Sequence, residues 1–227
     1  MLPACASASN LETSPTSRLR CDGRFERELR ERGFQAIAGV DEAGRGALFG
    51  PVFAAAVMLP PAHGLRGLND SKQLAAARRE QLAEAIRGQA VAWAVAQADS
   101  EEIDRINIYQ ASRLAMRRAV SQLVPSPDFV LVDALRLDLE VEQLGLIKGD
   151  ARVHSIAAAS ILAKVCRDAC MLEWDSIYPR YGLARHKGYG TVEHLAALEK
   201  FGPTSQHRVS FEPVRRLGRC FRAEAGR

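Results

Sequence analysis

The chain has 227 residues, 47% of them hydrophobic, and is long enough to bury a sizeable core as one large domain. No apolar stretch approaches the roughly 20 residues of a membrane span, and the N-terminus shows no basic region followed by an apolar one, so the sequence predicts a cytoplasmic protein without a membrane segment. Five scattered cysteines lack the paired spacing of a disulfide framework or a zinc site, and they indicate reduced thiols.

The formal net charge is only +4, but the basic residues are unevenly distributed. Residues 178–227 contain ten Lys and Arg against four Asp and Glu. This excess suits an anionic partner such as a nucleic acid, and a solvated basic face explains the same charge equally well. Charge alone leaves both interpretations open.

The first predicted elements follow a leader. Residues 1–22 are rich in Ser, Thr and Pro without apolar periodicity, which predicts a disordered leader before a single domain over residues 23–227. A short charged helix is expected over residues 25–33. Strands over residues 34–41 and 50–59 come next, and together they suggest a hairpin.

The remainder of the chain alternates helical and strand patterns. The predicted elements are helices over residues 75–88, 108–123, 154–174 and 191–200, strands over residues 91–98 and 128–135, and a glycine-rich loop over residues 181–190. In the second of these helices the expected core residues are Leu114, Met116, Val120 and Leu123. Early strands followed by alternating helix and strand predict an α/β fold with a mixed sheet covered by helices.

Two of the predicted strands end in acidic residues. Asp41 closes the apolar run AIAGV and is followed by Glu42, and Asp133 closes the run FVLV. Open sheets tend to place their chemistry at such strand ends. Adjacent strand residues point to opposite faces, so Asp41 and Glu42 can share one centre only if the strand already turns at Glu42 or if Glu42 contributes its backbone carbonyl. The following Gly44 makes such a turn easy.

A fourth acid, Asp168, is expected on the apolar face of the long helix over residues 154–174. The residues that share this face by helical spacing are Ile161, Val165 and Leu172. An inward carboxylate needs a partner, and Lys164 and Arg167 are the cationic candidates, although a helical ion pair is worth only about 0.3 to 0.5 kcal/mol. For Asp168 alone, a structural role and a functional role are equally well supported.

Taken as a set, the four acids are better explained by a shared cation. Hard oxygen ligands without a converging His or Cys suit Mg²⁺ or Mn²⁺. The sequence therefore predicts a divalent metal site whose ligands are Asp41, Glu42, Asp133 and Asp168.

An ordered series of motifs resembles a known nuclease family. The series consists of GVDEAGRG with GPV, LNDSKQL, FVLVD, KGD, SIAAASILAKVCRD, HKGYGT and GP...HRVSF, in the order and spacing of ribonuclease HII, the bacterial type 2 ribonuclease H. The resemblance extends from about Ile37 to Phe211. The related ribonuclease HIII usually carries an extra N-terminal domain and lacks Arg in the glycine loop, so Arg45 and the short leader favour ribonuclease HII.

The resemblance implies a ribonuclease H-like fold, in which helices flank a mixed β-sheet and the C-terminal portion is helical. It implies that the four acids bind two divalent ions, Mg²⁺ or Mn²⁺, and that cleavage leaves 5′-phosphate and 3′-hydroxyl ends. The implied substrates are RNA/DNA hybrids and duplex DNA containing ribonucleotides, which is cut on the 5′ side of the ribonucleotide. The implied protein is a monomeric endoribonuclease that supports ribonucleotide and RNA primer removal.

The loop Gly44-Arg45-Gly46 follows Asp41 and Glu42 in the sequence after a single alanine. Its glycines remove side chains, so backbone groups can approach a ligand closely. The resemblance implies that the loop reads the ribose 2′-hydroxyl, which distinguishes RNA from DNA. In isolation, an ordinary tight turn with a surface cation is the default explanation.

The motif HKGYGT supplies a second candidate substrate contact. Tyr189 lies between two glycines, and the resemblance implies that its ring packs on the nucleotide after the ribonucleotide; a loop tyrosine anchored on the core is the alternative. Lys72 and Lys187 resemble phosphate contacts, although exposed lysines usually only aid solubility. His207 and Arg208 are either phosphate-facing or structural.

Four positions depart from the usual family pattern. Ala47 and Phe49 replace a common Pro and a small residue after the glycine loop, Ala134 replaces a frequent Gly, and Cys166 replaces a frequent Thr. None of these removes an expected metal ligand. Phe49 and Ala134 are expected to influence the loop and the strand end, and so substrate preference and rate.

The sequence thus predicts a metal-dependent endoribonuclease, with two alternatives. A DNA-directed nuclease of the same superfold shares the acids but needs no loop that reads the sugar. A noncatalytic module that binds RNA/DNA hybrids needs the basic surface but not the acids. Cleavage of matched duplexes with and without ribonucleotides distinguishes all three.

Overall fold

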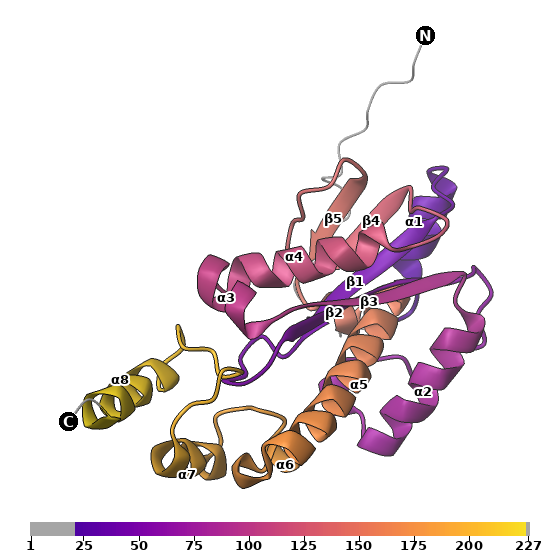
Figure 1. The fold of residues 1–227 in the computed structure, drawn as a ribbon. Coiled ribbons are helices and arrows are strands. Elements are labelled where there is room, and N and C mark those ends of the chain that lie inside the picture. Colours follow the sequence, from indigo (N-terminus) through magenta and orange to yellow (C-terminus); the bar gives the residue numbers. More distant parts are fainter. Residues whose placement is uncertain (1–20, 226–227) are drawn as a thin grey trace.

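The computed structural model describes the backbone of residues 21–225 and the side chains of residues 21–219. Most of the predicted leader, residues 1–20, therefore lies outside the described residues. A five-stranded sheet in the order β3-β2-β1-β4-β5 forms the centre of the described chain (Figure 1). Its strands are β1 (Ile37–Ala43), β2 (Val52–Met58), β3 (Ala92–Ala98), β4 (Phe129–Asp133) and β5 (Glu142–Leu146).

The sheet is mixed, as the sequence predicts. Strands β1 and β2 pair antiparallel, with Asp41 opposite Ala55, which confirms the expected hairpin. Strand β4 runs parallel to β1 on its other side, and the last pair of this ladder is Val40 with Val132. Because Asp41 and Asp133 each follow that pair, the two acidic strand ends lie side by side.

Strand β5 and helix α3 (Ser100–Ile106) were not predicted. Strand β5 has the sequence EQLGL, which lacks β-branched and aromatic residues, and its strand form comes from parallel pairing with β4 at the sheet edge. Helix α3 begins with a capping box, in which the Asp99 carboxylate accepts from the Glu102 N–H at 2.8 Å and Glu102 accepts from the Asp99 N–H at 3.1 Å. The D-x-x-E pattern of this box was a readable signal.

Helices cover both faces of the sheet (Figure 1). Helix α4 (Ile108–Ser121) packs on one face, and α5 (His154–Ile177) packs with α2 (Ala76–Gln89) on the other. Of the four core residues expected near α4, three are buried, whereas Leu114 is only partly buried at the edge of the core. The apolar face of α4 was therefore read correctly except at its margin.

Helix α5 approaches the central strand closely where β1 carries a glycine. A Cβ atom at Gly39 would lie 2.1 Å from the carbonyl carbon of Ser155, so a larger residue cannot occupy this position. Three successive alanines of α5, at positions 157–159, are fully buried against the same face. This tight contact fixes α5 relative to the end of β1, where Asp41 lies.

The remaining helices lie at the two ends of the described chain. Helix α1 (Arg24–Glu31) packs against the β4 side of the sheet, while α6 (Leu183–His186), α7 (Val192–Phe201) and α8 (Val214–Ala225) form the C-terminal part (Figure 1). The helical C-terminal portion is confirmed. The expected loop over residues 181–190 contains α6, which is one turn held between two residues with positive φ, Gly182 and Lys187. Among residues 21–225, no helix combines the length and apolar character needed to cross a bilayer.

Candidate active site

Asp41 is a buried carboxylate at the end of β1. Its side chain is 5% exposed, and its Oδ1 accepts from the Glu42 N–H at 2.7 Å. Burial raises the pKa of Asp41 well above its usual range, and the nearby charges of Glu42 and Asp133 raise it further. A hydrogen bond from the Ser160 hydroxyl on α5 lowers the pKa of Asp41 but does not reverse this shift. Asp41 therefore holds a charge poorly unless a cation joins it.

Glu42 lines a cleft beside Asp41. Strand pairing continues through Ala43 and the turn begins at Gly44, whose φ is +92°, so the strand does not turn at Glu42 as one of the two expected routes to a shared centre required. The Glu42 charge nevertheless acts on Asp41. One carboxylate oxygen, Oε1, lies 3.6 Å from Nη1 of Arg45, and the other, Oε2, is buried without a hydrogen-bond partner. Burial raises the pKa of Glu42, and the Arg45 charge only partly offsets this. An unpartnered buried carboxylate oxygen is costly, which indicates that a ligand completes the site.

Asp133 ends β4, and a further acid that was not predicted, Asp150, lies beside it. Its Oδ1 accepts from the Gly149 N–H at 2.7 Å, and burial raises its pKa. Asp150 is 7% exposed, and burial together with the Asp133 charge raises its pKa to about 6. The sequence analysis missed Asp150, although the KGD motif that contains it was noted. We call Asp41, Glu42, Asp133 and Asp150 the acid cluster.

Asp168 differs from the acid cluster because it is paired with two cationic side chains. Its Oδ1 is 2.6 Å from Nζ of Lys164, and its Oδ2 is 3.7 Å from Nη2 of Arg79. The side chain is 19% exposed, and Leu172, expected on the same apolar face, is 52% exposed, so the predicted inward stripe is wrong at its C-terminal end. Helix α5 extends beyond the sheet there. The ion pair with Lys164 agrees with the structural role that the sequence left open for Asp168. Arg167, the other candidate partner, instead donates to the Phe49 carbonyl.

One cleft brings most of the predicted site residues together. It has a volume of about 570 Å³, and its lining residues are Glu42, Ala43, Gly44, Arg45, Gly46, Ser71, Lys72, Arg79, Lys164 and Tyr189. Both cationic partners of Asp168 are in this lining, so Asp168 borders the same cleft. Four predicted site residues are not among the residues that line it: Asp41, Asp133, Asp168 and Lys187.

Tyr189 stands on two cationic side chains. Its ring centroid lies 5.3 Å from Cζ of Arg167 and 5.9 Å from Nζ of Lys164. Arg167 is fully buried and fits beneath the glycine loop, because a Cβ on Gly44 would lie 1.9 Å from its Nε. Tyr189 is half-buried and lines the cleft, so its loop lies at the cleft wall.

Three histidines form a second cluster behind Tyr189. The His207 Nδ1 accepts from the Thr204 N–H at 2.9 Å, so its Nε2–H donates to the His194 Nε2 at 3.1 Å. The His194 Nδ1–H then donates to the Tyr189 carbonyl at 3.0 Å. His186 stacks on His194 with ring centroids 4.5 Å apart. We call His186, His194 and His207 the histidine cluster.

Burial keeps two members of the histidine cluster neutral. It lowers the pKa of His194 to about 4 and that of His207 to about 3. Both rings are essentially without exposed surface, so His207 is structural rather than phosphate-facing, which decides one alternative left by the sequence. The neutral chain of donors and acceptors anchors the backbone of Tyr189.

The departures from the family pattern have local explanations. Phe49 is fully buried, with its ring edge-to-face against His207 at 4.8 Å. Ala134 has φ +52°, a conformation that glycine adopts more easily. Cys166 is partly buried, and its Sγ accepts from Arg87 at 3.7 Å.

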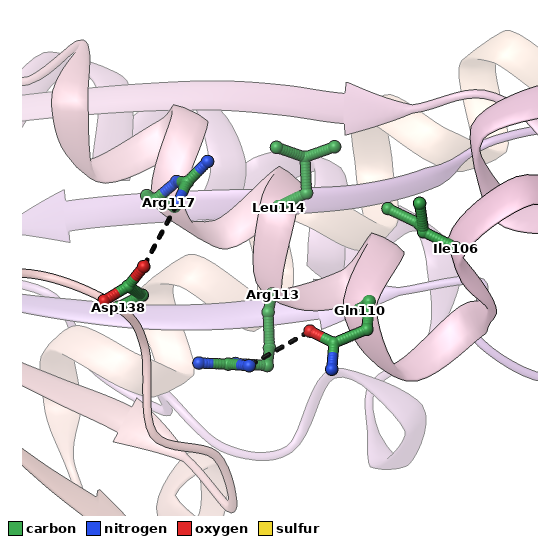
Figure 2. A pocket seen from close by; sticks show the side chains of 6 residues that line it. All are labelled: Ile106, Gln110, Arg113, Leu114, Arg117 and Asp138. Atoms are coloured by element: carbon green, nitrogen blue, oxygen red, sulfur yellow. Dashed lines mark hydrogen bonds and ion pairs between the residues drawn. The ribbon is translucent and has the colours of Figure 1, made fainter.

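A second hollow lies along α4 and contains none of the predicted site residues. Figure 2 shows its lining, with Arg117 paired to Asp138 at 3.7 Å and Arg113 donating to Gln110 at 3.0 Å. Leu114, which the core leaves partly uncovered, also faces it. We assign no catalytic role to this hollow.

The chemistry of the acid cluster fits divalent cations. Within residues 21–219, no three His, Cys, Asp or Glu side chains are already gathered in an arrangement that could hold a metal ion. The cluster nevertheless offers only hard oxygen donors, which repel one another, and one oxygen without a partner. A dication relieves this repulsion and satisfies the unpartnered oxygen, so the residues suit Mg²⁺ or Mn²⁺ better than a soft metal.

Comparison with known proteins identifies the family. The family model described as ribonuclease HII matches residues 38–214. A ribonuclease HII from Solibacter usitatus is 64% identical over 198 residues, 87% of each chain. A ribonuclease HII from Geobacillus thermodenitrificans is 56% identical over 192 residues, which are 85% of this chain and 74% of that protein.

Solved structures agree with the fold. The ribonuclease H2 from Pyrococcus horikoshii superposes with a TM-score of 0.71 at 26% identity, over 83% of this chain and 99% of that one. A ribonuclease HIII solved in complex with Mn²⁺ superposes with a TM-score of 0.63 at 22% identity, over 80% of this chain and 68% of that one, which shows the fold alone.

These matches decide between the alternatives that the sequence left open. A noncatalytic hybrid-binding module and a DNA-directed nuclease are both set aside, because the family model covers the acids, the glycine loop and the tyrosine loop together. The chain belongs to the ribonuclease HII family and is a metal-dependent endoribonuclease that cleaves RNA in RNA/DNA hybrids.

Proposed function

We propose that Asp41, Glu42, Asp133 and Asp168 are the metal ligands of this enzyme, and that they hold two divalent ions, Mg²⁺ or Mn²⁺. The observation that carries the proposal is the acid cluster, in which burial and mutual repulsion raise the pKa of its members while one Glu42 oxygen lacks a partner. The Mn²⁺ bound by the ribonuclease HIII of similar fold supports the choice of metal. Asp150 lies beside Asp133 and is proposed as a supporting carboxylate.

Asp168 has the weakest geometric support of the four, and its role follows from its place. Lys164 and Arg79 neutralise it now, and both line the cleft with Glu42. We propose that Asp168 would hold metal in place of its ion pairs with these two cations. Lys164 and Arg79 would then be available as partners for the substrate phosphates.

The chemistry of cleavage divides between the ions and the protein. When bound, divalent metal supplies charge to the scissile phosphate and lowers the pKa of water, so that hydrolysis leaves 5′-phosphate and 3′-hydroxyl ends. The acids set the position of the reaction by their fixed bonds: Asp41 accepts from the Glu42 N–H and Asp133 from the Gly149 N–H. Arg45 and Lys72 in the cleft balance the carboxylate charge and approach the substrate backbone.

We propose that duplex DNA containing single ribonucleotides is a substrate, in addition to RNA/DNA hybrids. The loop Gly44-Arg45-Gly46 lines the cleft next to Glu42, which supports its reading of the ribose 2′-hydroxyl beside the cutting site. Tyr189 lies in the same cleft, where its ring can stack on the following nucleotide. We propose that the active unit is a monomer.

Cleavage of matched duplexes tests the proposal. The substrates contain no ribonucleotide, one, or a run, and each is incubated with Mg²⁺, with Mn²⁺ and with chelator. We expect cuts only in the duplexes with ribonucleotides, on the 5′ side of the single one, and only with metal. Cleavage of the all-DNA duplex, or cleavage with chelator, contradicts the proposal.

A further inference from the structure

Arg208 is a fully buried arginine with no carboxylate partner among the described residues. Burying a cation without a directly paired carboxylate is expensive, and the Asp104 charge acts on Arg208 without forming an ion pair with it. Burial and the nearby Arg167 charge lower the pKa of Arg208 to about 9, which still leaves it protonated near neutral pH. Its guanidinium therefore carries N–H groups on all three nitrogens, of which Nε and Nη1 donate hydrogen bonds and Nη2 is buried without a partner among the described residues.

Two of these donors hold the glycine loop from beneath. The Arg208 Nη1 donates to the Arg45 carbonyl at 3.0 Å, and its Nε donates to the Gly50 carbonyl at 2.9 Å. Its backbone N–H donates to the Leu48 carbonyl at 2.9 Å. One residue thus fixes three carbonyls between positions 45 and 50, which is the segment that leaves β1 and returns to β2.

The bond to the Arg45 carbonyl also sets the direction of the next N–H. A trans peptide unit is planar, with its C=O and N–H pointing in opposite directions. Since the Arg45 carbonyl points inward to Arg208, the Gly46 N–H points outward. Gly46 is exposed, it lines the cleft, and its N–H has no acceptor among the described residues.

We infer that Arg208 is a positioning residue for substrate selection, which turns the Gly46 N–H into the cleft as a donor to the ribose 2′-oxygen. The inference rests on the proposed reading of the 2′-hydroxyl by the glycine loop. Arg208 itself touches no substrate, because the loop covers it. Its loss leaves the peptide free to rotate, and the donor is then no longer aimed.

Binding measurements on Arg208→Gln and Arg208→Lys test this inference. Each protein is titrated, in chelator so that nothing is cut, with an all-DNA duplex and with the same duplex containing one ribonucleotide. We expect the wild-type preference for the ribonucleotide to fall roughly three- to tenfold in Arg208→Gln, the range of one lost hydrogen bond. In Arg208→Lys, which keeps the charge but cannot reach both carbonyls, part of the preference returns. Affinity for the all-DNA duplex stays within about twofold.

The exposed Arg215, which pairs with Glu212, provides a matched control. Arg215→Gln removes the same charge and should leave the preference unchanged. If Arg208→Gln retains the wild-type preference, the inference is wrong. If the wild-type protein itself shows no preference for the ribonucleotide, the proposed reading of the 2′-hydroxyl has failed instead.

A measurement on the unaltered protein decides the case if both Arg208 variants unfold. With ¹⁵N-glycine labelling, the Gly46 amide is assigned from the signal lost in Gly46→Ala. We expect this amide to shift on adding the duplex with one ribonucleotide and to shift much less with the all-DNA duplex. If the wild-type protein prefers the ribonucleotide and this amide still shifts equally with both duplexes, or not at all, the inference is wrong.

Discussion

The histidine cluster is buried and the acid cluster is partly buried, and the two satisfy their polar atoms in opposite ways. The histidine cluster completes its own hydrogen bonds in one neutral chain that ends on the Tyr189 carbonyl. The acid cluster leaves a carboxylate oxygen without a partner and brings like charges together. The difference indicates that the first is a support and the second is a binding site that a ligand completes.

The largest expected effect comes from neutralising one member of the acid cluster. Asp41→Asn should reduce cleavage to the level of the reaction without enzyme, because it removes a carboxylate that we propose as a metal ligand. Binding of the duplex should persist, because Lys and Arg contacts to phosphate supply most of the affinity. The metal-free variant should also melt at a higher temperature than the wild type, since repulsion among the acids decreases.

Asp138→Asn provides the control for that experiment. Asp138 is a well-exposed acid beside α4 and outside the cleft, so its variant should cut at the wild-type rate. Metal-dependent cleavage that survives Asp41→Asn would remove Asp41 from the site.

As pH falls, the two clusters should change the free energy of unfolding in opposite directions. His194 and His207 have lower pKa values folded than the usual 6.5, about 4 and 3, so the unfolded chain binds more protons below pH 6.5. Their contribution to the free energy of unfolding is present above pH 6.5 and declines by about 1.4 kcal/mol per pH unit for each ring as pH falls. Asp150 has a raised pKa of about 6, so protonation below pH 6 stabilises the folded protein.

Urea unfolding of the metal-free protein between pH 7 and pH 5 measures these slopes. In His194→Gln, the free energy of unfolding should decrease less steeply as pH falls, by about the slope that one titrating group contributes. In Asp150→Asn it should decrease more steeply. An unchanged slope in His194→Gln means that this ring is not held neutral by its surroundings.

The sequence predicted Asp41 and Asp133 as candidate site residues, because each ends a short apolar run that can be recognised from neighbouring residues alone. It could not predict that Arg79 pairs with Asp168, since that contact joins α2 to α5 across the fold. Strand β5 escaped prediction for the same reason, because only its pairing with β4 makes it a strand. The histidine cluster depends on three segments that meet only in space, and single residues gave no sign of it.

A third prediction concerns the surface that the histidine cluster supports. Tyr189→Ala should lose about 1 to 3 kcal/mol of substrate stabilisation, the range of an aromatic stacking contact, whereas Tyr189→Phe keeps the ring and should be mild. The loss should be greater for a single embedded ribonucleotide than for a long hybrid, which offers many registers. Kinetics of both variants on both substrates measure this. Equal slowing on the two substrates makes the ring structural.

A smaller effect is expected at the end of β4. Ala134 has φ +52°, so Ala134→Gly should relieve backbone strain and stabilise the protein by about 0.5 to 1 kcal/mol. Ala85→Gly, in the interior of α2, should destabilise by about 1 kcal/mol and serves as the control of opposite sign. Thermal melting of both variants checks the pair, and a destabilised Ala134→Gly contradicts the argument.

The smallest effect is expected from removing the leader. A protein that starts at Gly23 should cut at the wild-type rate, because the residues proposed for catalysis lie beyond it. A slight loss of stability is expected, since the Cys21 carbonyl lies 3.2 Å from Nε2 of His154 and Cys21 packs beside the core. A shortened protein that melts cooperatively but no longer cuts shows that the leader has a function.

Direct measurement of metal binding tests the central claim, that the acids at the ends of β1 and β4 hold the divalent ions. Free Mn²⁺ is counted by electron paramagnetic resonance while the wild type, Asp41→Asn, Asp133→Asn and Asp138→Asn are titrated with a noncleavable duplex present. We predict two bound ions in the wild type and in Asp138→Asn, and fewer in the other two. Unchanged Mn²⁺ binding in both Asp41→Asn and Asp133→Asn would contradict the account.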